Sequence, residues 1–280
     1  MDVRFHKYQG TGNDFVVLEA LDGRPAWLDR DAVVRICDRH FGVGADGVLL
    51  VERGVESPWF MRVLNADGSE AEMCGNGIRC VARHVREILG DDAGVLRIET
   101  PAGVKPCAIR LGPDGLVSSV AVGLGAPILE RWRIPIAGGG DNLDVGVSAL
   151  GRHFTGHGVS MGNPHFVIFE GVDAEDAGRF GSMLSTSPMF PMQANIEFAE
   201  PVGRQHFRVA VYERGCGLTR VCGTGAGATA VAAVLTGRAA AGAPIRVDLP
   251  GGPLDLTVAP DLSDVVLEGP AVRVFRGVLE

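Results

Sequence analysis

The sequence predicts an α+β protein of two similar halves, each a curled sheet around a helix. In both halves strand patterns dominate, and only one or two helices interrupt them. A Cys-Gly-x-Gly motif opens a run of small or apolar residues twice, at Cys74 and at Cys222. Strands, an asparagine-bearing loop, a further strand and this motif follow in the same order each time, which indicates an internal duplication.

Length, composition and charge fit this organisation. The chain has 280 residues, 46 % hydrophobic and 21 % charged, which suits one large or two ordinary well-packed domains. Its formal net charge of −8 argues against a nucleic-acid partner, which would favour a basic face. No apolar run is long enough to span a membrane. The first residues lack the apolar stretch of a signal peptide, so we expect a cytoplasmic protein whose six cysteines are thiols.

The first half opens with a strand pattern over 3–18 that a glycine-rich turn at 10–15 interrupts. This turn presents Asn13, whose amide can face a cleft, although Asn-Asp beside glycine is also ordinary turn chemistry. The loop at Asn65 leads to the helix that Cys74 opens. The remaining expected elements are a helix over 31–40 and strands over 48–51, 60–64, 96–100, 104–111 and 116–122.

The second half follows a Gly- and Pro-rich stretch at 123–140, which marks the expected boundary. A polar loop is expected from Glu213 to Arg220, directly before the helix that Cys222 opens. The other expected elements are a helix over 174–183 and strands over 158–161, 166–170, 205–212, 245–249, 254–258, 264–268 and 271–276.

Both motif cysteines are expected at helix N-termini, where free N–H groups and the helix dipole favour a thiolate or another anion. Three kinds of chemistry use cysteines in such a setting. For zinc, the pairs 74/80 and 216/222 are spaced C-x5-C, whereas structural zinc prefers roughly two to four intervening residues. For dinucleotide binding, Gly223, Gly225 and Ala228 loosely match the glycine pattern of a dinucleotide-binding loop. A polar loop separates this segment from the preceding strand, however, and no acidic residue follows at the spacing of a ribose ligand.

The third kind is acid–base chemistry at a carbon atom. One thiolate would remove a Cα proton, and an opposed thiol would return a proton to the other face. Only Lys7 and Lys105 are lysines, and neither has a setting that suggests a pyridoxal Schiff base. The developing negative charge would then be met by oriented N–H groups. Two unrelated buried cysteines are the plain alternative.

Polar residues near strand ends favour the acid–base hypothesis. Each has an ordinary explanation as a turn, a core histidine or a surface ion pair. As a set they offer amides, an imidazole, a carboxylate and a guanidinium, which fits an amino-acid substrate with a second charged end. The set comprises Asn163, His165, Asn195, Glu213 and Arg214.

With these residues assembled, the chain resembles the diaminopimelate epimerase family of cofactor-independent amino-acid epimerases. The matching segments run in family order across nearly the whole chain, and the motif around Cys74 is the most specific. They are residues 10–15, 65–69, 73–80, 162–165, Asn195, 213–215 and 222–225.

The resemblance implies an α/β (α+β) fold of two pseudo-symmetric domains, each a barrel-like, mostly antiparallel sheet around a central helix, with the active site in the cleft between them. Domains at 1–124 and 125–268 are expected, with a terminal strand at 269–280 that returns to the first. It also implies interconversion of LL- and meso-diaminopimelate for lysine and peptidoglycan synthesis, without cofactor or metal, by a cytoplasmic homodimer.

The resemblance implies roles for individual residues as well. Cys74 and Cys222 would be the acid–base pair, with His165 and Glu213 polarising or orienting the reacting groups. The backbone at Gly75, Asn76, Gly223 and Thr224 would hold the reacting carboxylate. The rest of the substrate would be bound by Asn13, Asn65, Asn163, Asn195, Glu213 and Arg214, with Arg214 on the distal carboxylate.

Three positions depart from the family pattern. Gly47 stands where glutamine is common, Leu218 where an acidic residue is usual, and Cys216 where a small aliphatic residue is usual. These departures bear on fine tuning more than on the reaction. Two alternative functions stay open: epimerisation of another amino acid by the same pair of thiols, and a non-enzymatic thiol switch.

Overall fold

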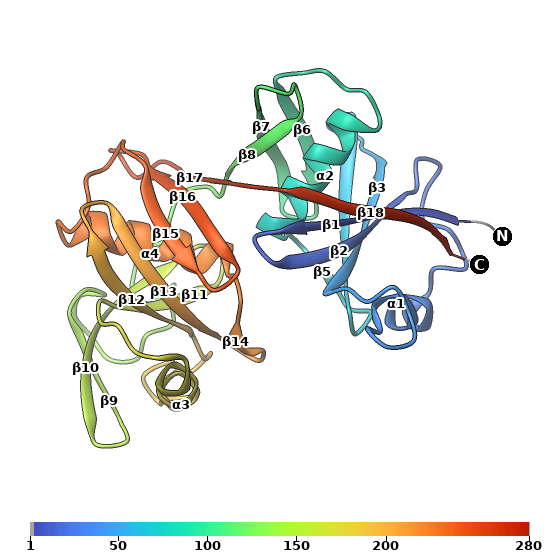
Figure 1. Cartoon of the computed structure of the whole chain (residues 1–280). Helices are drawn as coiled ribbons and strands as arrows, with labels where there is room; N and C mark the ends of the chain where they lie inside the picture. Colours follow the sequence, from blue (N-terminus) through green and yellow to red (C-terminus); the bar gives the residue numbers. More distant parts are fainter. Residues whose placement is uncertain (1–2, 280) are drawn as a thin grey trace. The chain divides into compact units, whose positions relative to one another are not determined.

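The computed structural model describes residues 3–279, which form two compact units. Unit 1 comprises 3–123 together with 268–279, and unit 2 comprises 124–267. In Figure 1 the C-terminal strand runs beside the N-terminal strand, so the chain ends in the unit in which it began. Each unit has its own buried apolar clusters.

Unit 1 is a curled, mostly antiparallel sheet. Its strands pair in the order β18, β1, β2, β3, β4, β6, β7, β8, with the short β5 also on β4; only β2–β3 and β4–β6 are parallel. Helix α1 connects the first parallel pair and α2 the second. The elements are β1 (Val3–Gly10), β2 (Asn13–Glu19), α1 (Arg30–Cys37), β3 (Gly47–Arg53), β4 (Trp59–Asn65), β5 (Glu70–Ala71), α2 (Gly75–Glu87), β6 (Val95–Thr100), β7 (Gly103–Leu111), β8 (Val117–Gly123) and β18 (Val272–Leu279).

Unit 2 has a sheet of the same kind. Its strands pair in the order β9, β10, β11, β12, β13, β15, β16, with β14 also on β13; β11–β12 and β13–β15 are parallel. Its elements are β9 (Val145–Ala149), β10 (Arg152–Ser160), β11 (Pro164–Ile168), α3 (Ala174–Ser185), β12 (Asn195–Gly203), β13 (His206–Glu213), β14 (Gly217–Thr219), α4 (Gly223–Leu235), β15 (Ile245–Leu249) and β16 (Gly252–Val258), followed by β17 (Val265–Gly269) at the boundary.

The two units repeat one topology element by element. In each, a hairpin leads through a helix to a parallel strand, then to an antiparallel partner, a short strand and the cysteine-headed helix. The strands β2, β3 and β4 thus correspond to β11, β12 and β13, and α2 corresponds to α4. The internal duplication expected from the order of motifs is present in the fold.

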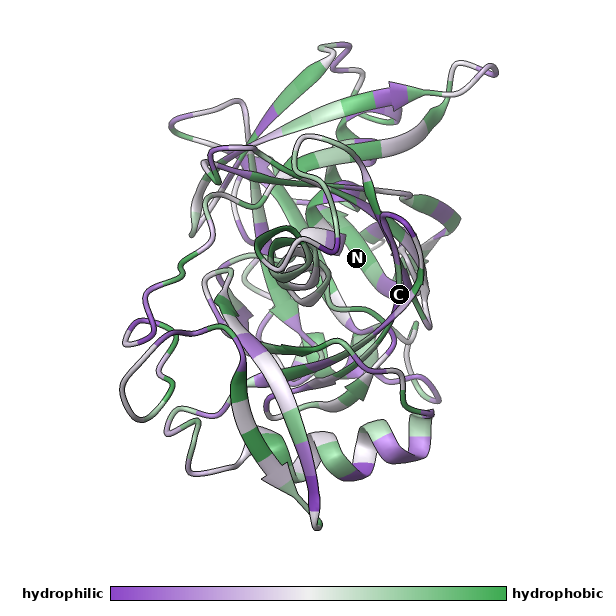
Figure 2. Cartoon of the chain, turned by 90° about the vertical axis from the view of Figure 1, so that its left-hand side faces the viewer, coloured by the Kyte–Doolittle hydropathy of each residue, from purple (hydrophilic) through white to green (hydrophobic). Residues whose placement is uncertain are grey.

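The inner helix of each unit is buried for a different reason. Helix α2 turns an apolar face with Ile78, Val81 and Val85 into its sheet. Helix α4 is buried almost all round because its residues are nearly all Gly, Ala and Val, and small side chains let strands approach it closely. In Figure 2, α4 is seen end-on with strands around it. Within the described chain, no helix has the length and apolar character needed to cross a membrane.

Several element bounds differ from those expected. The hairpin β9–β10 over 145–160 was expected only as a strand at 158–161, because its first part alternates with glycine, serine and threonine. The segment Glu213 to Arg220 is not wholly loop, since β14 pairs with the end of β13. The helix expected over 31–40 ends at Cys37.

Candidate functional site

Cys74 occupies the N-cap position of α2 in unit 1. Its Sγ accepts from the Gly77 amide at 3.4 Å and lies 3.8 Å from Asn13 Oδ1. The amides of Gly75 and Asn76 belong to the first turn, where no intrahelical acceptor is available to them. An anion held at this helix end would therefore meet backbone donors and the positive end of the helix dipole.

Asn13 begins β2 beside the same helix end. Its Oδ1 accepts from Asn76 Nδ2 at 3.3 Å, and its Nδ2 donates to Asp46 Oδ2 at 2.6 Å. Asp46 also pairs with Arg39, which binds Asp14 as well. This network fixes the orientation of the Asn13 amide, which presents its carbonyl oxygen toward the thiol and Asn76.

Asn65 ends β4 opposite Gly47, the first residue of β3. The Asn65 amide donates to Ser69 Oγ at 2.9 Å. A Cβ atom added at Gly47 would lie 2.7 Å from the Leu64 carbonyl oxygen, too close for any larger residue without a backbone shift. The glycine that departs from the family pattern therefore fits a close strand approach in this chain.

Cys222 occupies the N-cap position of α4 in unit 2, as Cys74 does in unit 1. Its Sγ accepts from the Gly225 amide at 3.4 Å and lies 3.5 Å from Thr224 Oγ1. Burial raises the pKa of this thiol well above its usual value, and Glu213 and Glu197 raise it further against the opposing effect of those two donors. The expectation that the helix N-terminus would lower this pKa was wrong for Cys222, because desolvation and two carboxylates outweigh the helix end.

His165 lies beneath this helix end, fully buried on β11. Its Nδ1 is 2.6 Å from Glu197 Oε1, and its Nε2 is 3.0 Å from Asn163 Oδ1. The Asn195 amide nitrogen is 3.4 Å from the same Nδ1. The imidazole is thus held at both nitrogens, and Asn163, His165 and Asn195 form one polar cluster within unit 2.

Glu213 and Arg214 complete this cluster at the end of β13. Glu213 Oε1 accepts from Thr219 Oγ1 at 2.6 Å, which orients the carboxylate. The Arg214 amide donates to Asn195 Oδ1 at 2.8 Å, and its guanidinium donates to Met192 O at 2.9 Å. Parallel pairing of β11 with β12 and antiparallel pairing of β12 with β13 align these strand ends, which explains why residues distant in sequence meet.

Glu197 was missed in the sequence and is the most buried carboxylate of the cluster. A Cβ atom added at Gly225 would lie 2.8 Å from Glu197 Oε1, so the carboxylate packs directly against the first turn of α4. Burial raises its pKa, Glu213 raises it further, and His165 lowers it. The signal that could have found it is the alternation of β12, which places Glu197 on the same side as Asn195.

The departure at 216 lies in the turn between β13 and β14, and that at 218 lies on β14. Cys216 is exposed and Cys80 is fully buried, which agrees with the expectation that each is either a buried or an incidental cysteine. Leu218 is about half exposed and packs on α3, where a Cβ of Gly178 would be 3.1 Å from its Cδ1. Leu218 therefore covers a helix of its own unit rather than extending the polar cluster.

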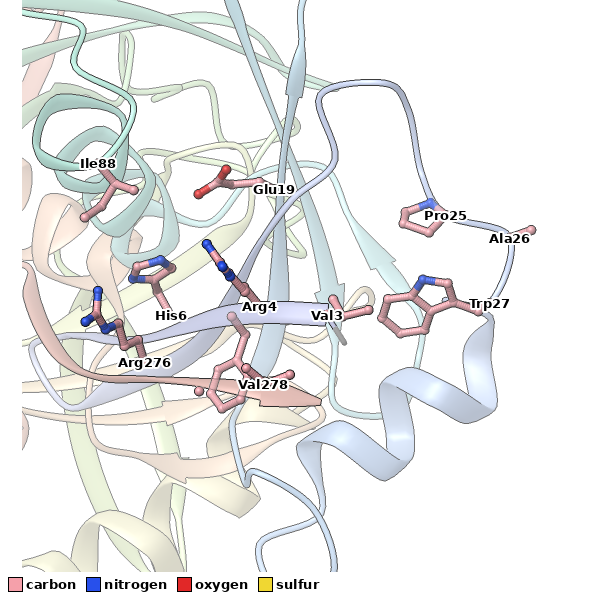
Figure 3. A pocket seen from close by; sticks show the side chains of 12 residues that line it. Val3, Arg4, His6, Glu19, Pro25, Ala26, Trp27, Ile88, Arg276 and Val278 are labelled. Carbon is pink, nitrogen blue, oxygen red and sulfur yellow. The ribbon is translucent and has the colours of Figure 1, made fainter. Parts of the chain in front are cut away.

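A cavity of about 1340 Å³ opens elsewhere in unit 1, beside β1 and the end of β18. Trp27, Ile88, Arg4 and Arg276 are among its lining residues (Figure 3). The two arginines make its wall positive. The cavity lies toward the C-terminal end of α2, at Ile88, whereas Cys74 caps the N-terminal end of that helix.

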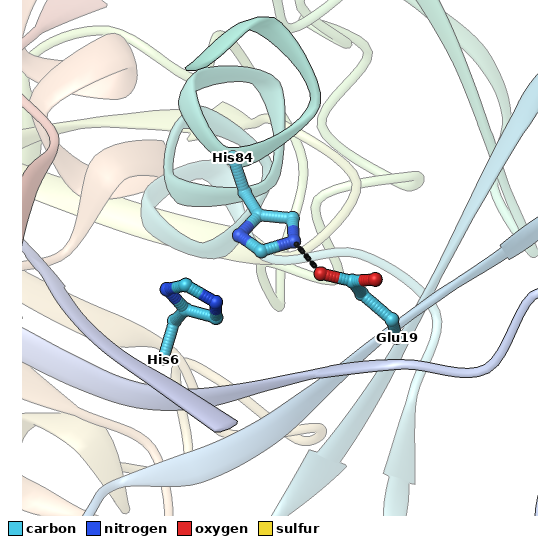
Figure 4. A group of neighbouring side chains, drawn as sticks. All are labelled: His6, Glu19 and His84. Atoms are coloured by element: carbon cyan, nitrogen blue, oxygen red, sulfur yellow. Dashed lines mark hydrogen bonds and ion pairs between the residues drawn. The ribbon is translucent and has the colours of Figure 1, made fainter. Parts of the chain in front are cut away.

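Two side chains that line this cavity and one fully buried histidine offer the only grouped metal-ligand atoms found in the described residues. His6, Glu19 and His84 place one such atom each within 4.8 Å of one another (Figure 4). His84 is already satisfied, with Nε2 3.1 Å from Glu19 and Nδ1 3.3 Å from the Tyr8 hydroxyl. Burial lowers the pKa of both His6 and His84, and the charge of Arg273 lowers it further. Positive neighbours repel a divalent cation, and hydrogen bonds account for His84 and Glu19, whereas the buried Nδ1 of His6 has no hydrogen-bond partner among the described residues.

The fold of two repeated units, each with a sheet around an inner helix, also occurs in proteins whose structures have been solved. A protein from Pseudomonas aeruginosa described as a predicted epimerase shares the fold with a TM-score of 0.71 at 16 % sequence identity, with 99 % of each chain covered. This likeness defines the class of fold.

Sequence comparison narrows the class. The family model described as diaminopimelate epimerase matches residues 5–127 and 158–274. The diaminopimelate epimerase of Moorella thermoacetica is 44 % identical over 278 residues, which is 98 % of each chain. That of a Synechococcus strain is 45 % identical over 283 residues, 98 % of this chain and 96 % of the relative. The chain belongs to the diaminopimelate epimerase family.

Proposed function

We propose that the chain interconverts LL- and meso-2,6-diaminopimelate by inverting one α-carbon, in the synthesis of lysine and peptidoglycan precursors. Family membership supports this proposal. The observation that carries it is the repeated placement of a cysteine at the N-terminus of each unit's inner helix. In the proposed reaction Cys74 and Cys222 act on opposite faces of the α-carbon.

The proton balance of this reaction is simple. One sulfur, as thiolate, takes the Cα proton, and the electron pair of the broken C–H bond moves into the carboxylate to form an enediolate. The other sulfur, as thiol, gives its proton to the opposite face, and the enediolate returns its electron pair to the new C–H bond. The configuration is inverted and the two sulfurs have exchanged roles, so a proton must return before the next turnover in the same direction.

The enediolate requires stabilisation because no pyridoxal ring takes up its charge. We propose that the backbone amides of Gly75 and Asn76 on α2, and of Gly223 and Thr224 on α4, hold the reacting carboxylate. First-turn amides are oriented before the reaction and cost no reorganisation when the charge develops. His165 and Glu213 would orient the reacting groups on the Cys222 side.

The second amino-acid end of the substrate needs its own donors and acceptors. We propose that Arg214 binds the distal carboxylate by paired charge-assisted hydrogen bonds. The amides of Asn13, Asn65, Asn163 and Asn195 would bind the distal ammonium group and the remaining polar atoms, assisted by Glu213. This division explains why amides dominate the set, since an amide serves both as donor and as acceptor.

Solvent exchange tests the reaction directly. Reduced protein should introduce deuterium from D2O at the α-position of LL-diaminopimelate, with meso product forming in parallel, as followed by NMR and chiral chromatography. Cys74→Ser and Cys222→Ser should each lower kcat about 10²-fold or more, the usual size of an acid–base contribution. Exchange at the parental rate in both variants would contradict the two-thiol mechanism.

The two alternatives predict other results. An epimerase of a different amino acid would exchange deuterium into that compound, and not into diaminopimelate, across a panel that includes proline and hydroxyproline. A thiol switch would exchange no compound, and its assembly state would follow the redox potential of the solution.

We further propose a cytoplasmic homodimer that needs no cofactor or metal and binds no nucleic acid. Four apolar side chains are exposed on β18, Val272, Val274, Phe275 and Val278, and they give a surface on which a second copy could pack. Light scattering during size-exclusion chromatography should give twice the chain mass of 29.4 kDa. A monomer at micromolar concentration would contradict the dimer.

A further inference from the structure

The guanidinium of Arg79 is fully buried in unit 1, five residues after Cys74 on α2. It donates to three neutral oxygens: Thr11 Oγ1 at 2.9 Å, Gly75 O at 3.1 Å and Pro270 O at 3.3 Å. Among the described residues no carboxylate lies within ion-pair distance of it. Burial lowers its pKa to about 10, which leaves it charged at neutral pH. A buried cation without an anion is costly, so its retention calls for a cause.

The internal repeat shows that this charge is not a requirement of the fold. The residue five positions after Cys222 is Gly227, which packs against the apolar side chains of Leu124 and Met161. The same topology therefore forms around α4 without a buried guanidinium. Arg79 is thus a feature of the Cys74 side alone.

Unit 2 has an acidic side chain, hydrogen-bonded to His165, at the matching helix end. Glu197, two residues into β12, packs on Gly225 of α4, whereas its counterpart Leu49, two residues into β3, packs on Gly77 of α2. An apolar side chain in unit 1 is thus replaced by a carboxylate in unit 2. One cysteine-capped helix end has a buried cation next to it, and the other has a buried acid.

We propose that Arg79 is a positioning residue that holds Cys74 as the thiolate in the resting protein, while Glu197 holds Cys222 as the thiol. Negative charge on Cys80 and on Cys74 interacts favourably with Arg79. Among the described residues of unit 2, no lysine or arginine is buried. The pair would then begin each cycle with one base and one acid, as inversion requires. This catalytic interpretation of the asymmetry rests on the proposed function.

Thiol alkylation as a function of pH tests the proposal without substrate. Reduced protein is treated with iodoacetamide between pH 5 and 10 as the probed range, and labelling of each cysteine is quantified by mass spectrometry of its peptide. The pH midpoint is compared rather than the absolute rate, because Cys222 is the less accessible thiol. The midpoint of Cys74 should lie below that of Cys222; the reverse order would overturn the proposal.

Arg79→Met removes the charge and keeps much of the volume. It should raise the alkylation midpoint of Cys74 by about one pH unit or more, since an opposite charge nearby typically moves a titration by one to three units. Arg79→Lys keeps the charge and should restore at least half of that shift. An unchanged midpoint in folded Arg79→Met protein would show that Arg79 has a purely structural role.

Arg83→Met is the matched control. Arg83 lies one turn further along α2 and tethers the neighbouring backbone, donating to Ala271 O at 2.5 Å, but its charge is paired with Glu87 at 3.0 Å. It should leave the Cys74 midpoint within about 0.3 pH units, the change expected for a paired, more distant charge. An equal shift in both variants would mean that loss of the tether, not loss of charge, moves the thiol.

Glu197→Gln tests the other half of the proposal and remains available if Arg79→Met does not fold. It should lower the alkylation midpoint of Cys222 and leave that of Cys74 unchanged. No change at Cys222 would overturn the assignment of Glu197. These readouts need no turnover, so their failure would leave the deuterium-exchange test of function intact, and failure of that test would leave the measured thiol asymmetry intact.

Discussion

Gly225 shows how closely a single residue position is constrained at the Cys222 end. A Cβ added there would lie 2.8 Å from Glu197 Oε1 and 3.3 Å from Cys222 Sγ. Because the carboxylate is fixed by His165, it cannot yield easily. Gly225→Ala should cost about 1–3 kcal/mol of unfolding free energy, the usual size of overpacking, and lower kcat at least tenfold. Urea denaturation and deuterium exchange measure the two effects.

Gly75→Ala is the complementary change at the other helix. Nothing lies within 4 Å of a Cβ at this position, so stability should change by no more than about 0.5 kcal/mol. Activity should nevertheless fall, because the methyl group would enter the space assigned to the substrate carboxylate. The same urea and exchange measurements apply. A stable and fully active variant would argue against that carboxylate site.

At the scale of elements, α2 has two chemically different ends. Its N-terminus carries Cys74, and its last turns carry His84, fully buried between Tyr8 and Glu19. The two strands that contact His84 both belong to unit 1, so this end of the helix reports on the integrity of that unit. It offers a pH-dependent measure of stability that is independent of the thiols.

Burial lowers the pKa of His84 to about 3, and His6 and Arg273 add to the effect. The unfolded chain binds a proton at His84 below about pH 6.5, whereas the folded chain does so only near pH 3. Below pH 6.5 the unfolded chain gains a proton at His84 that the folded chain does not bind. The free energy of unfolding therefore decreases as the pH falls from 6.5 toward 3, by on the order of a few kcal/mol from this group. His84→Gln should flatten the dependence of the unfolding free energy on pH in this window.

The control for that slope is His206→Gln in unit 2, where His206 lies near the surface beside Asp248. Because His206 helps to lower the pKa of Asp248, this variant should change the slope only near and below the ordinary Asp pKa of 3.8, and should leave it as in the parent at higher pH. An unaltered slope in the His84 variant would mean that other groups, such as Asp14, whose pKa is lowered by its pairing with Arg39 and Lys7 against the effect of burial, dominate acid sensitivity.

At the scale of the whole molecule, the features that both units share could be predicted from the sequence, whereas the residues that differ between the two units could not. The two cysteine-headed helices follow from glycines and apolar spacing, which are local signals, and Asn195 is predicted at a strand start from its neighbours. Glu197 and Arg79 could not be identified, because their importance comes from burial in a context that their repeat partners Leu49 and Gly227 do not share. The parallel pairs of each unit were also beyond local patterns, since a helix separates the paired strands.

The C-terminal strand β18 belongs to unit 1, although it follows unit 2 in the chain. β18 pairs along β1, and the segment before it supplies Pro270 O to Arg79 and Ala271 O to Arg83. A chain that ends at residue 269 should therefore lose one of the two strand partners of β1 and the backbone acceptors of Arg79 and Arg83, which destabilises unit 1 by on the order of several kcal/mol. Amide hydrogen exchange by mass spectrometry should show the loss.

The expected pattern of that exchange separates the two units. Protection should fall throughout β1, β2 and α2, while α4 and the strands around it, whose apolar cluster contains no residue after 267, should keep theirs. The Cys74 midpoint in alkylation should rise as well, because Arg79 would gain water and lose its fixed position. Equal loss of protection in both units would instead show that unit 2 depends on β18 for its folding, and the two repeats would then be one cooperative structure rather than two.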